Sequence, residues 1–231
     1  MNTEIDSLIA GVLMNVRKFE HAYQQVIDYS HLHEVYEKNC KIPWQYCGII
    51  AVYSGNAYDE LNTRLRGGDT IECNSQEYVD TFSMLLSEGL RKLDSYNSET
   101  VCRNVKCPIN NCEQIYDWFK NRKGAIFVDP AFMSTSANWQ PVDDRVMFKI
   151  KTLPSNSNAK SIMPIISIFQ KGNVEREQEV LFDKNTLFKI ENVENDIIYL
   201  KEVERIKSEF KLDYKYWDII NANTLPSCRY L

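Results

Sequence analysis

Two glutamates, Glu177 and Glu179, stand two residues apart at the entrance to the apolar run Val180-Leu181-Phe182. In an extended strand, side chains at positions i and i+2 lie on the same face, about 6.6 Å apart. The spacing therefore predicts two carboxylates on one surface, with Val180 turned toward a core. Such a pair can stabilise a positively charged transition state and take a proton from a nucleophile, and the leading candidate is substitution at a sugar C1 through an oxocarbenium ion. A solvated strand entrance explains the same residues without any chemistry.

The elements that must position this pair change in character along the chain. Apolar residues recur at helical spacing in 8–27, 58–65 and 76–93. The Gly67-Gly68 pair ends the second of these segments as a helix C-cap does. From residue 100 onward short β-prone runs follow, at 100–105, 125–127, 132–136, 146–151, 180–182, 187–190 and 197–200. Helices followed by mainly antiparallel strands predict an α+β fold, and we expect one domain, 45–231, with 1–44 as an N-terminal helical segment packed on it.

Composition narrows the classes of function. A chain of 231 residues that is 44% hydrophobic can bury one large core, and a net charge of −5 disfavours nucleic acid as the main partner. The seven cysteines form no C-x-x-C pair and stand near no histidine at zinc spacing, so we expect reduced thiols and no metal site. No apolar run reaches the length of a membrane span. The apolar stretch 8–14 follows Glu4 and Asp6 instead of basic residues, which is typical of an amphipathic helix and not of an export signal.

Further motifs stand upstream of the acidic pair in a regular order. Arg103 lies within the β-prone run Thr100 to Val105, Ser134 within Phe132-Met133-Ser134-Thr135-Ser136, and Phe169 closes Ser167-Ile168-Phe169. With the helical stretch that begins Tyr53-Ser54-Gly55 and with Glu177-Gln178-Glu179-Val180-Leu181-Phe182, this order resembles the Arg-Ser-Glu (E-x-E) class of mono-ADP-ribosyltransferases. That family includes bacterial toxins and effectors and vertebrate arginine-specific transferases. The resemblance spans residues 45–204.

The resemblance implies an ADP-ribosyltransferase-like fold of two roughly perpendicular antiparallel β-sheets with an N-terminal helical layer. It also implies a central cleft for NAD+, which is the substrate, and no requirement for a metal. Glu179 would be the catalytic acid that holds a ribose hydroxyl and stabilises charge on the ribose, while Ser134 would orient Glu179. Arg103 would bind the phosphate and ribose of NAD+. The ordinary alternatives are a strand-edge glutamate, a turn serine and a surface arginine.

Glu177, by the same resemblance, faces the acceptor. A carboxylate there favours arginine, whose guanidinium it matches in charge and geometry, and it equally suits a hydroxyl acceptor as a base. Asn104, Thr135 and Ser136 complete the implied NAD+ contacts, and Phe169 either stacks on the nicotinamide or fills the core. Asn104 departs from the glycine that the family usually has, although asparagine tolerates unusual backbone angles.

The sequence thus predicts a glycosyltransferase that cleaves NAD+ at the nicotinamide–ribose bond and attaches ADP-ribose to a protein of a host or competitor. Ubiquitin is one candidate target, because some bacterial effectors of this size modify a threonine of ubiquitin. We expect delivery by a non-Sec secretion route and action in the cytosol of the target cell. Two alternatives stay open: an NAD+ glycohydrolase, in which water is the acceptor, and a catalytically inert protein-binding module, for which Asn104 is the hint.

Overall fold

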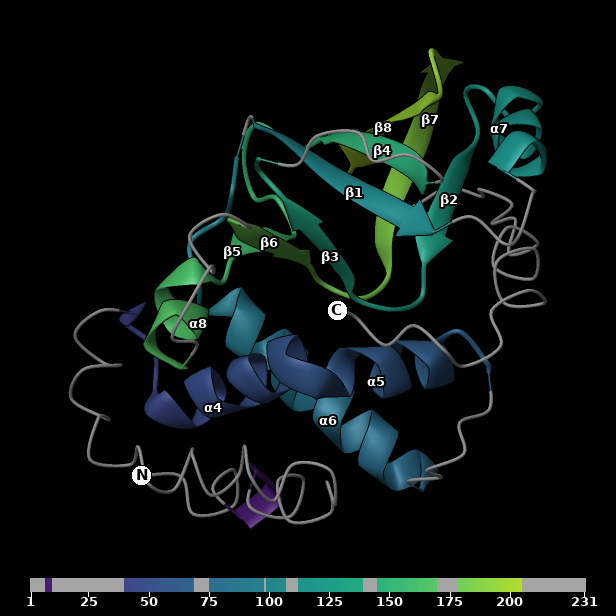
Figure 1. Cartoon of the computed structure of the whole chain (residues 1–231). Helices are drawn as coiled ribbons and strands as arrows, with labels where there is room; N and C mark the ends of the chain where they lie inside the picture. The colour runs from purple at the N-terminus through teal and green to yellow at the C-terminus, as the bar shows by residue number, and fades with distance from the viewer. Residues whose placement is uncertain are drawn as a thin grey trace.

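The computed structural model describes residues 7–9, 40–68, 75–97, 99–106, 112–138, 145–169 and 178–204. A layer of helices lies against one side of a twisted β-sheet, and a further helix, α7 (Cys112–Lys120), lies at the other end of the sheet (Figure 1). The predicted helical segment 1–44 falls mostly outside the described residues, so the division at residue 44 stays a prediction.

The helical layer contains one rod whose hydrogen-bonding pattern changes in the middle. α4 (Trp44–Val52) passes directly into the π-helical turn η3 (Tyr53–Ala57) and then into α5 (Tyr58–Leu65). η3 carries Ser54-Gly55-Asn56, three residues of low helix propensity, and a regular α-helix is least favoured there. The rod ends at Gly67, whose φ of 84° suits glycine, as the Gly67-Gly68 pair predicts.

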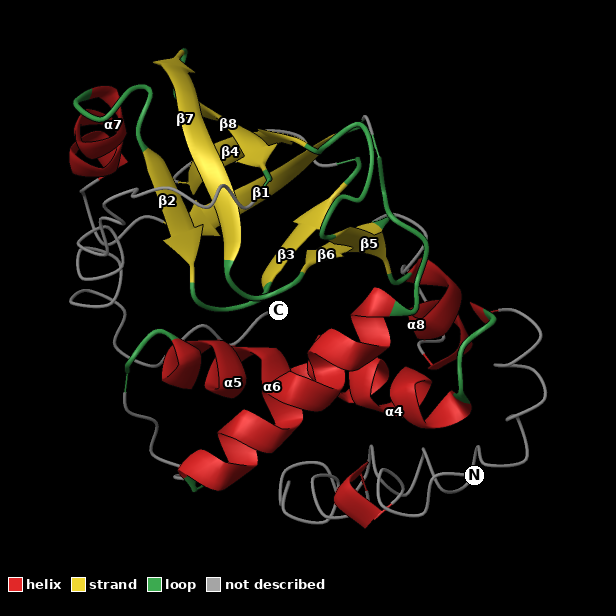
Figure 2. Cartoon of the chain, turned by 180° about the vertical axis from the view of Figure 1, so that it is seen from behind, coloured by secondary structure: helices red, strands yellow, loops and turns green. Residues whose placement is uncertain are grey.

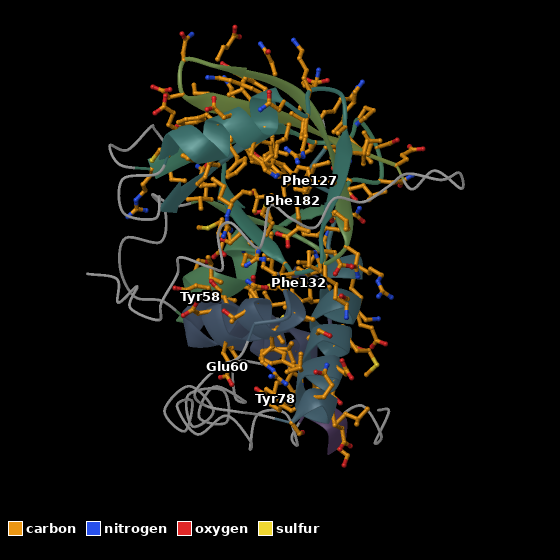
Figure 3. The ribbon with its side chains drawn as sticks, turned by 90° about the vertical axis from the view of Figure 1, so that its right-hand side faces the viewer. Tyr58, Glu60, Tyr78, Phe127, Phe132 and Phe182 are labelled. Atoms are coloured by element: carbon orange, nitrogen blue, oxygen red, sulfur yellow. The ribbon has the colours of Figure 1, made fainter. Side chains whose placement is uncertain are left out.

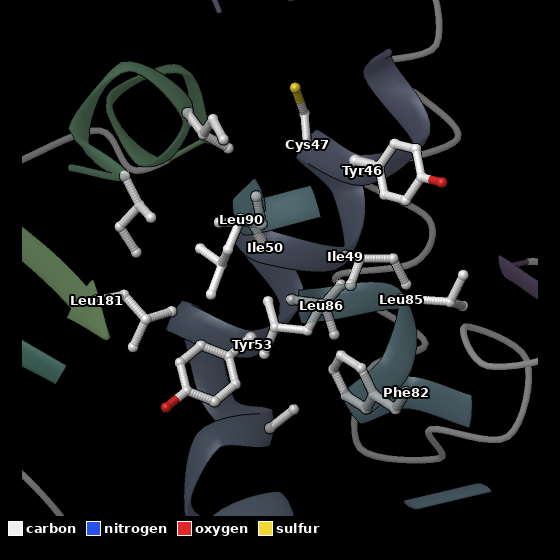
Figure 4. Packing of buried hydrophobic residues seen from close by; sticks show 14 of the residues in the cluster. Tyr46, Cys47, Ile49, Ile50, Tyr53, Phe82, Leu85, Leu86, Leu90 and Leu181 are labelled. Atoms are coloured by element: carbon white, nitrogen blue, oxygen red, sulfur yellow. The ribbon is translucent and has the colours of Figure 1, made fainter. Parts of the chain in front are cut away.

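α6 (Gln76–Arg91) is the long amphipathic helix that the apolar spacing predicts. It begins after Ser75, whose Oγ accepts a hydrogen bond of 3.2 Å from the Tyr78 backbone N–H. Its buried face packs on α4, with side chains of both helices interleaved in one core (Figure 4). Four of the α6 side chains in this core are fully buried, and each contributes about 2 kcal/mol to folding: Phe82, Leu85, Leu86 and Leu90. α8 (Met163–Phe169) adds Ile165 and Ile166 to the same core.

The strands form one hydrogen-bonded sheet in the order β2-β7-β8-β4-β1-β3-β6-β5. Their bounds are β1 (Thr100–Lys106), β2 (Ile126–Asp129), β3 (Met133–Ser136), β4 (Arg145–Lys151), β5 (Ala159–Ser161), β6 (Glu179–Phe182), β7 (Thr186–Glu194) and β8 (Ile197–Val203). Neighbours run antiparallel except β4 and β8, which are parallel.

The predicted α+β class is confirmed, and the sheet has two parts as expected. β1 and β3 share the register pair Cys102↔Ser136, and across this junction the short part β3-β6-β5 turns away from the larger part (Figure 2). The two parts therefore belong to one continuous strand order and are not separate sheets. The junction is narrow, because β1 and β3 are in register only at Cys102↔Ser136.

β6 lies between two hydrophobic cores. Val180 and Phe182 face the core enclosed by the sheet and α7, whereas Leu181 faces the helical layer. Figure 3 shows the same division, with Phe127 and Phe182 within the sheet core and Phe132 nearer the helices. Side chains alternate along a strand. Glu179, two residues before Leu181, is therefore directed toward the helical layer.

The sheet contains a second buried carboxylate, which anchors a connection between two strands. Glu202 in β8 is 0% exposed and accepts hydrogen bonds from the backbone N–H groups of Leu153, at 3.0 Å, and Asn158, at 2.7 Å. Ser157 Oγ donates a third, at 2.6 Å. These partners belong to the connection between β4 and β5, so Glu202 fixes that connection against β8.

Cysteine chemistry differs in part from the expectation. Cys40, Cys47 and Cys102 are buried free thiols, as expected, but Cys112 is disulfide-bonded. Sequence spacing does not reveal which sulfurs the fold brings together, and this is why a disulfide was not foreseen.

Candidate active site

Glu179 is held by two hydroxyl groups that come from different layers of the molecule. It is the first residue of β6 and is 9% exposed. Its Oε1 accepts a hydrogen bond of 2.7 Å from Ser134 Oγ in β3, and its Oε2 accepts one of 2.7 Å from Ser54 Oγ in η3. Hydrogen bonds to an ionised acceptor are short and strong. Both carboxylate oxygens are therefore fixed in orientation.

Ser134 connects the carboxylate to a guanidinium group. In the β3–β6 register Ser134 lies opposite Leu181 and Ser136 opposite Glu179, which places Ser134 diagonally from Glu179 on one face of the sheet. The backbone carbonyl of Ser134 accepts a hydrogen bond of 2.7 Å from Nη1 of Arg103 in β1. The structure thus brings Arg103, Ser134 and Glu179 together from three strands, as their order in the sequence predicts.

Thr135 and Ser136 form hydrogen bonds within the protein, and Asn104 lies in the regular part of β1. Thr135 Oγ1 donates to the Val180 carbonyl at 2.6 Å, and Ser136 Oγ accepts from the Asn138 backbone N–H at 3.1 Å. Asn104 lies in regular register opposite Met147 and is not among the described residues with positive φ. Its tolerance of unusual backbone angles is therefore not used here. The roles of these three residues in binding NAD+ stay predictions.

Two predicted residues are not placed. Glu177 lies outside the described residues, and so does the side chain of Phe169, although Phe169 is the last residue of α8. Gln178 has a φ of 40° and β6 begins only at Glu179, so the expectation of an extended strand through residues 177–179 is wrong, and the shared face cannot be inferred from strand alternation. The distance between the two carboxylates and the stacking of Phe169 on nicotinamide remain predictions.

Ser54 contacts Glu179 directly, and sequence reasoning gives it no role. Its place in a helical stretch 125 positions upstream of Glu179 does not reveal the contact. One signal was available: Ser54-Gly55-Asn56 is a run of weak helix formers inside an otherwise continuous helix. Such a run indicates an irregular turn, and irregular helical turns are frequent at functional sites.

A set of buried, hydrogen-bonded groups lies next to the site, on the side of the helical layer. Asn62 Nδ2 donates to the Tyr53 hydroxyl at 2.9 Å, and the Phe132 backbone N–H donates to Asn62 Oδ1 at 3.1 Å, two residues before Ser134. Tyr53 is 0% exposed, and its ring packs edge-on against Phe132. Burial raises the pKa of Tyr53 well above its ordinary value, and the hydrogen bond from Asn62 opposes the rise. The phenol therefore stays neutral.

The charges around Tyr53 belong to the same site. Glu179 raises the pKa of Tyr53 further, whereas Arg103 and Arg66 lower it, so all three charges lie within electrostatic reach of one phenol. Arg66 is bound to Asp129 by two hydrogen bonds, at 3.2 and 2.9 Å, and Asp129 is 1% exposed. This fork supports a structural role for Arg66, since it ties the end of α5 to the end of β2.

The site does not coincide with either of two cavities in the described part of the molecule. One of about 480 Å³ is lined by Gln178 and Val180, the neighbours of Glu179 in sequence. Because Val180 faces away from Glu179, this cavity lies on the opposite side of β6. The other, of about 410 Å³, lies at the C-terminal end of α6 beside Lys160 and Asp183. Neither is lined by Glu179, Ser134 or Arg103.

Within the described ranges, no group of histidine, cysteine, aspartate and glutamate side chains could hold a metal ion. No helix in the same part of the chain is long and apolar enough to cross a membrane.

Solved structures of similar fold include bacterial ADP-ribosyltransferases. The toxin Vis of Vibrio splendidus, solved in complex with agmatine, matches with a TM-score of 0.54 at 22% identity over 80% of this chain and 86% of Vis. The C3 exoenzyme of Clostridium limosum matches with a TM-score of 0.56 at 18% identity over 78% of this chain and 95% of that one. These likenesses confirm the predicted ADP-ribosyltransferase-like fold.

A sequence relative is the NAD(+)–protein-arginine ADP-ribosyltransferase Tre1 of Serratia proteamaculans. It is 31% identical over 146 residues, which cover 63% of this chain but only 28% of Tre1. The family model described as ADP-ribosyltransferase exoenzyme matches residues 47–213, well over half of the chain. The chain therefore belongs to the ADP-ribosyltransferase exoenzyme family, as the order of Arg103, Ser134 and Glu179 predicts.

Proposed function

We propose that this chain is a mono-ADP-ribosyltransferase that cleaves the nicotinamide–ribose bond of NAD+ and transfers ADP-ribose to an arginine of a target protein. The observation that carries the proposal is the carboxylate of Glu179, held on both oxygens by hydroxyl groups and linked through Ser134 to Arg103. A fixed anion beside a cation suits a substrate whose ribose becomes positive and whose diphosphate is negative.

Glu179 is the catalytic residue of this proposal. It accepts a hydrogen bond from a ribose hydroxyl and stabilises the positive charge that develops on the ribose as the C–N bond breaks. The electron pair of that bond leaves with nicotinamide. A carboxylate that is already oriented needs no reorganisation at this moment, which is the advantage of its two hydroxyl partners.

Ser134 and Arg103 prepare the site for the substrate. Ser134 orients Glu179 through its side chain and Arg103 through its carbonyl oxygen. The guanidinium of Arg103 carries several donors in a planar fork, so with Nη1 engaged by Ser134 it is suited to hold a phosphate or ribose oxygen as well. Asn104, Thr135, Ser136 and Phe169 remain candidates for further contacts with NAD+.

Glu177 is assigned to the acceptor side. An acceptor nitrogen attacks ribose C1 and loses its proton to a nearby base, and a second carboxylate two residues before Glu179 can supply that base. The name of Tre1 specifies protein arginine, and Vis was solved with agmatine, a guanidine compound, which supports a guanidinium acceptor. Neither relative supports ubiquitin or a Thr/Ser acceptor.

We place the action of the protein on a target protein of another cell. Relatives described as toxins support this assignment, among them Plx2a of Paenibacillus larvae, which matches with a TM-score of 0.56. The delivery route and the compartment of action remain proposals.

The test follows labelled NAD+ in the presence of agmatine or of a cell lysate. The wild-type protein should release nicotinamide and label both acceptors, and Glu179→Gln should lose both activities. Glu177→Gln should keep nicotinamide release but lose transfer, because only the acceptor side is changed. Glu194→Gln, at an exposed carboxylate at the end of β7, is the matched control and should behave as wild type.

Three outcomes would contradict the proposal. Release of nicotinamide without any labelled acceptor would identify a glycohydrolase. Absence of both activities in the wild-type protein would favour an inert binding module. Full activity of Glu179→Gln would remove Glu179 from the mechanism.

A further inference from the structure

We propose that Ser54 is a positioning residue for the transfer reaction: its hydroxyl, presented by the π-helical turn η3, fixes the second oxygen of the Glu179 carboxylate. The inference rests on the proposed function, since it matters for catalysis only if Glu179 acts on NAD+. The hydrogen bond from Ser54 Oγ to Oε2 measures 2.7 Å, the same length as the bond from Ser134 Oγ to Oε1.

The two hydroxyls have complementary effects on one carboxylate. The last torsion of a glutamate side chain is broad, so a carboxylate held on one oxygen can still rotate about its terminal bond. A second donor on the other oxygen removes that freedom. Ser134 supplies a donor from the sheet and Ser54 supplies one from the helical layer, so the plane of the carboxylate is defined by both layers.

The contact is not the usual one for a serine inside a helix. Such a hydroxyl ordinarily bonds the carbonyl four residues earlier or faces water. Ser54 instead reaches a carboxylate in another layer, from a turn whose geometry departs from the α-helices on either side of it. The wider turn is therefore the element that delivers this donor.

Both hydrogen bonds favour the ionised form of Glu179. Arg103 from β1, Arg66 at the end of α5 and Tyr53 from η3 are charged or titratable groups in the same electrostatic neighbourhood. A change at Ser54 leaves all three in place, so a shift in the pH dependence of the reaction reports the lost hydrogen bond.

The experiment compares Ser54→Ala with Ser54→Thr in NAD+ cleavage and in transfer to agmatine. Alanine removes the donor, and because it is a better helix former than serine the variant should keep its fold. We expect kcat to fall about 10- to 100-fold with KM for NAD+ little changed, the loss typical of a partner that orients a reacting group. The acid limb of the pH–rate profile should move to higher pH. Threonine keeps a hydroxyl and should restore most of the rate.

Two results would overturn the inference. One is a Ser54→Ala variant whose kcat stays within about twofold of wild type with an unmoved acid limb. The other is a Ser54→Thr variant as slow as Ser54→Ala, which would trace the loss to the backbone of η3. In either case an active wild-type protein and an inactive Glu179→Gln variant leave the proposed function standing, so the two failures are distinguishable.

Discussion

Glu179 and Glu202 are both buried carboxylates on strands of one sheet, but they are held by different kinds of donor. Glu179 is 9% exposed and takes its hydrogen bonds from the hydroxyls of Ser54 and Ser134. Glu202 is 0% exposed and takes two of its three from the backbone N–H groups of Leu153 and Asn158. Glu179 is held by hydroxyls, which can rotate, and Glu202 is held mainly by backbone groups, which cannot.

This difference separates a reactive carboxylate from a structural one. A hydroxyl can donate or accept, so the surroundings of Glu179 adapt when the carboxylate gains a proton or a new partner. A backbone N–H only donates, so the two backbone hydrogen bonds to Glu202 form only when both oxygens of the side chain are acceptors, as in the ionised carboxylate. A carboxylate that receives a ribose hydroxyl in addition to its own partners is served by the first arrangement, because the serine hydroxyls can adjust to the new donor while they keep the carboxylate oriented.

The largest effect should come from Glu179→Gln. We expect the rate of NAD+ cleavage to fall about 10³-fold, since the amide cannot stabilise positive charge. The midpoint of thermal unfolding should change little, because the hydroxyls of Ser54 and Ser134 can turn to meet an amide. Kinetics and calorimetry on one preparation measure both, and a large loss of stability would contradict the contrast with Glu202.

Glu202→Gln should show the reverse pattern. Whichever way the amide is turned, its NH₂ group meets a backbone N–H, and a buried group is left without a hydrogen bond. We expect a loss of about 2–4 kcal/mol in the free energy of unfolding, with the activity per folded molecule unchanged. Urea denaturation gives the first quantity. An unchanged denaturation midpoint would show that Glu202 is not the structural anchor described above.

Replacing Glu202 and replacing Glu179 should also change the pH dependence of stability differently, because Glu202 acts on the pKa of Lys160. Burial lowers the pKa of Lys160 from its ordinary value of 10.5, whereas Asp94, Glu202 and Asp183 act in the opposite direction. The unfolded chain therefore binds more protons than the folded chain in the window just below 10.5, and the contribution of Lys160 to stability rises with pH across that window.

Removing the charge of Glu202 should lower the pKa of Lys160 further, so in Glu202→Gln the rise begins at lower pH. Glu179→Gln should keep the wild-type dependence. Urea denaturation between pH 7 and 10.5 tests this, with Lys160→Met as the background in which the difference must vanish. Equal slopes in both glutamine variants would contradict it.

The smallest effects on stability are expected from replacing two glycines of the helical layer, Gly55 and Gly89. A Cβ added at Gly55 in η3 meets no atom within 4 Å, whereas one at Gly89 in α6 lies 3.2 Å from Tyr46 and 3.3 Å from Ile50. Gly55→Ala should stabilise the protein by up to about 1 kcal/mol, and Gly89→Ala should destabilise it because α4 and α6 approach too closely there. Thermal melts decide both signs. A loss of NAD+ affinity in Gly55→Ala without a loss of stability would extend the site to the backbone of η3.

Sequence reasoning predicted the residues of the site that lie in local motifs. Arg103 and Ser134 lie on strands that their β-prone runs predict, and Glu179 begins the strand whose apolar run it precedes. The weak helix formers around Ser54 indicate an irregular turn, but the role of Ser54 could not be predicted because it depends on a contact with a residue 125 positions away. Glu202 was beyond reach for the same reason, since it follows a predicted strand but binds a connection 44 to 49 positions earlier. The parallel pairing of β4 with β8 likewise has no local signature.

The turn at Tyr53–Ala57 sets a strict limit on insertions and deletions in this part of the chain. Losing one residue there would restore an α-helix and rotate everything downstream by about 100° while drawing it back by about 1.5 Å. Asn62 would then lose its hydrogen bond with Phe132, and Arg66 would lose its hydrogen bonds with Asp129. The end of α5 would no longer be aligned with the sheet. The segment should therefore accept many amino-acid exchanges but no change of length, and a library of single-codon deletions along Trp44–Leu65 would locate that boundary to the residue.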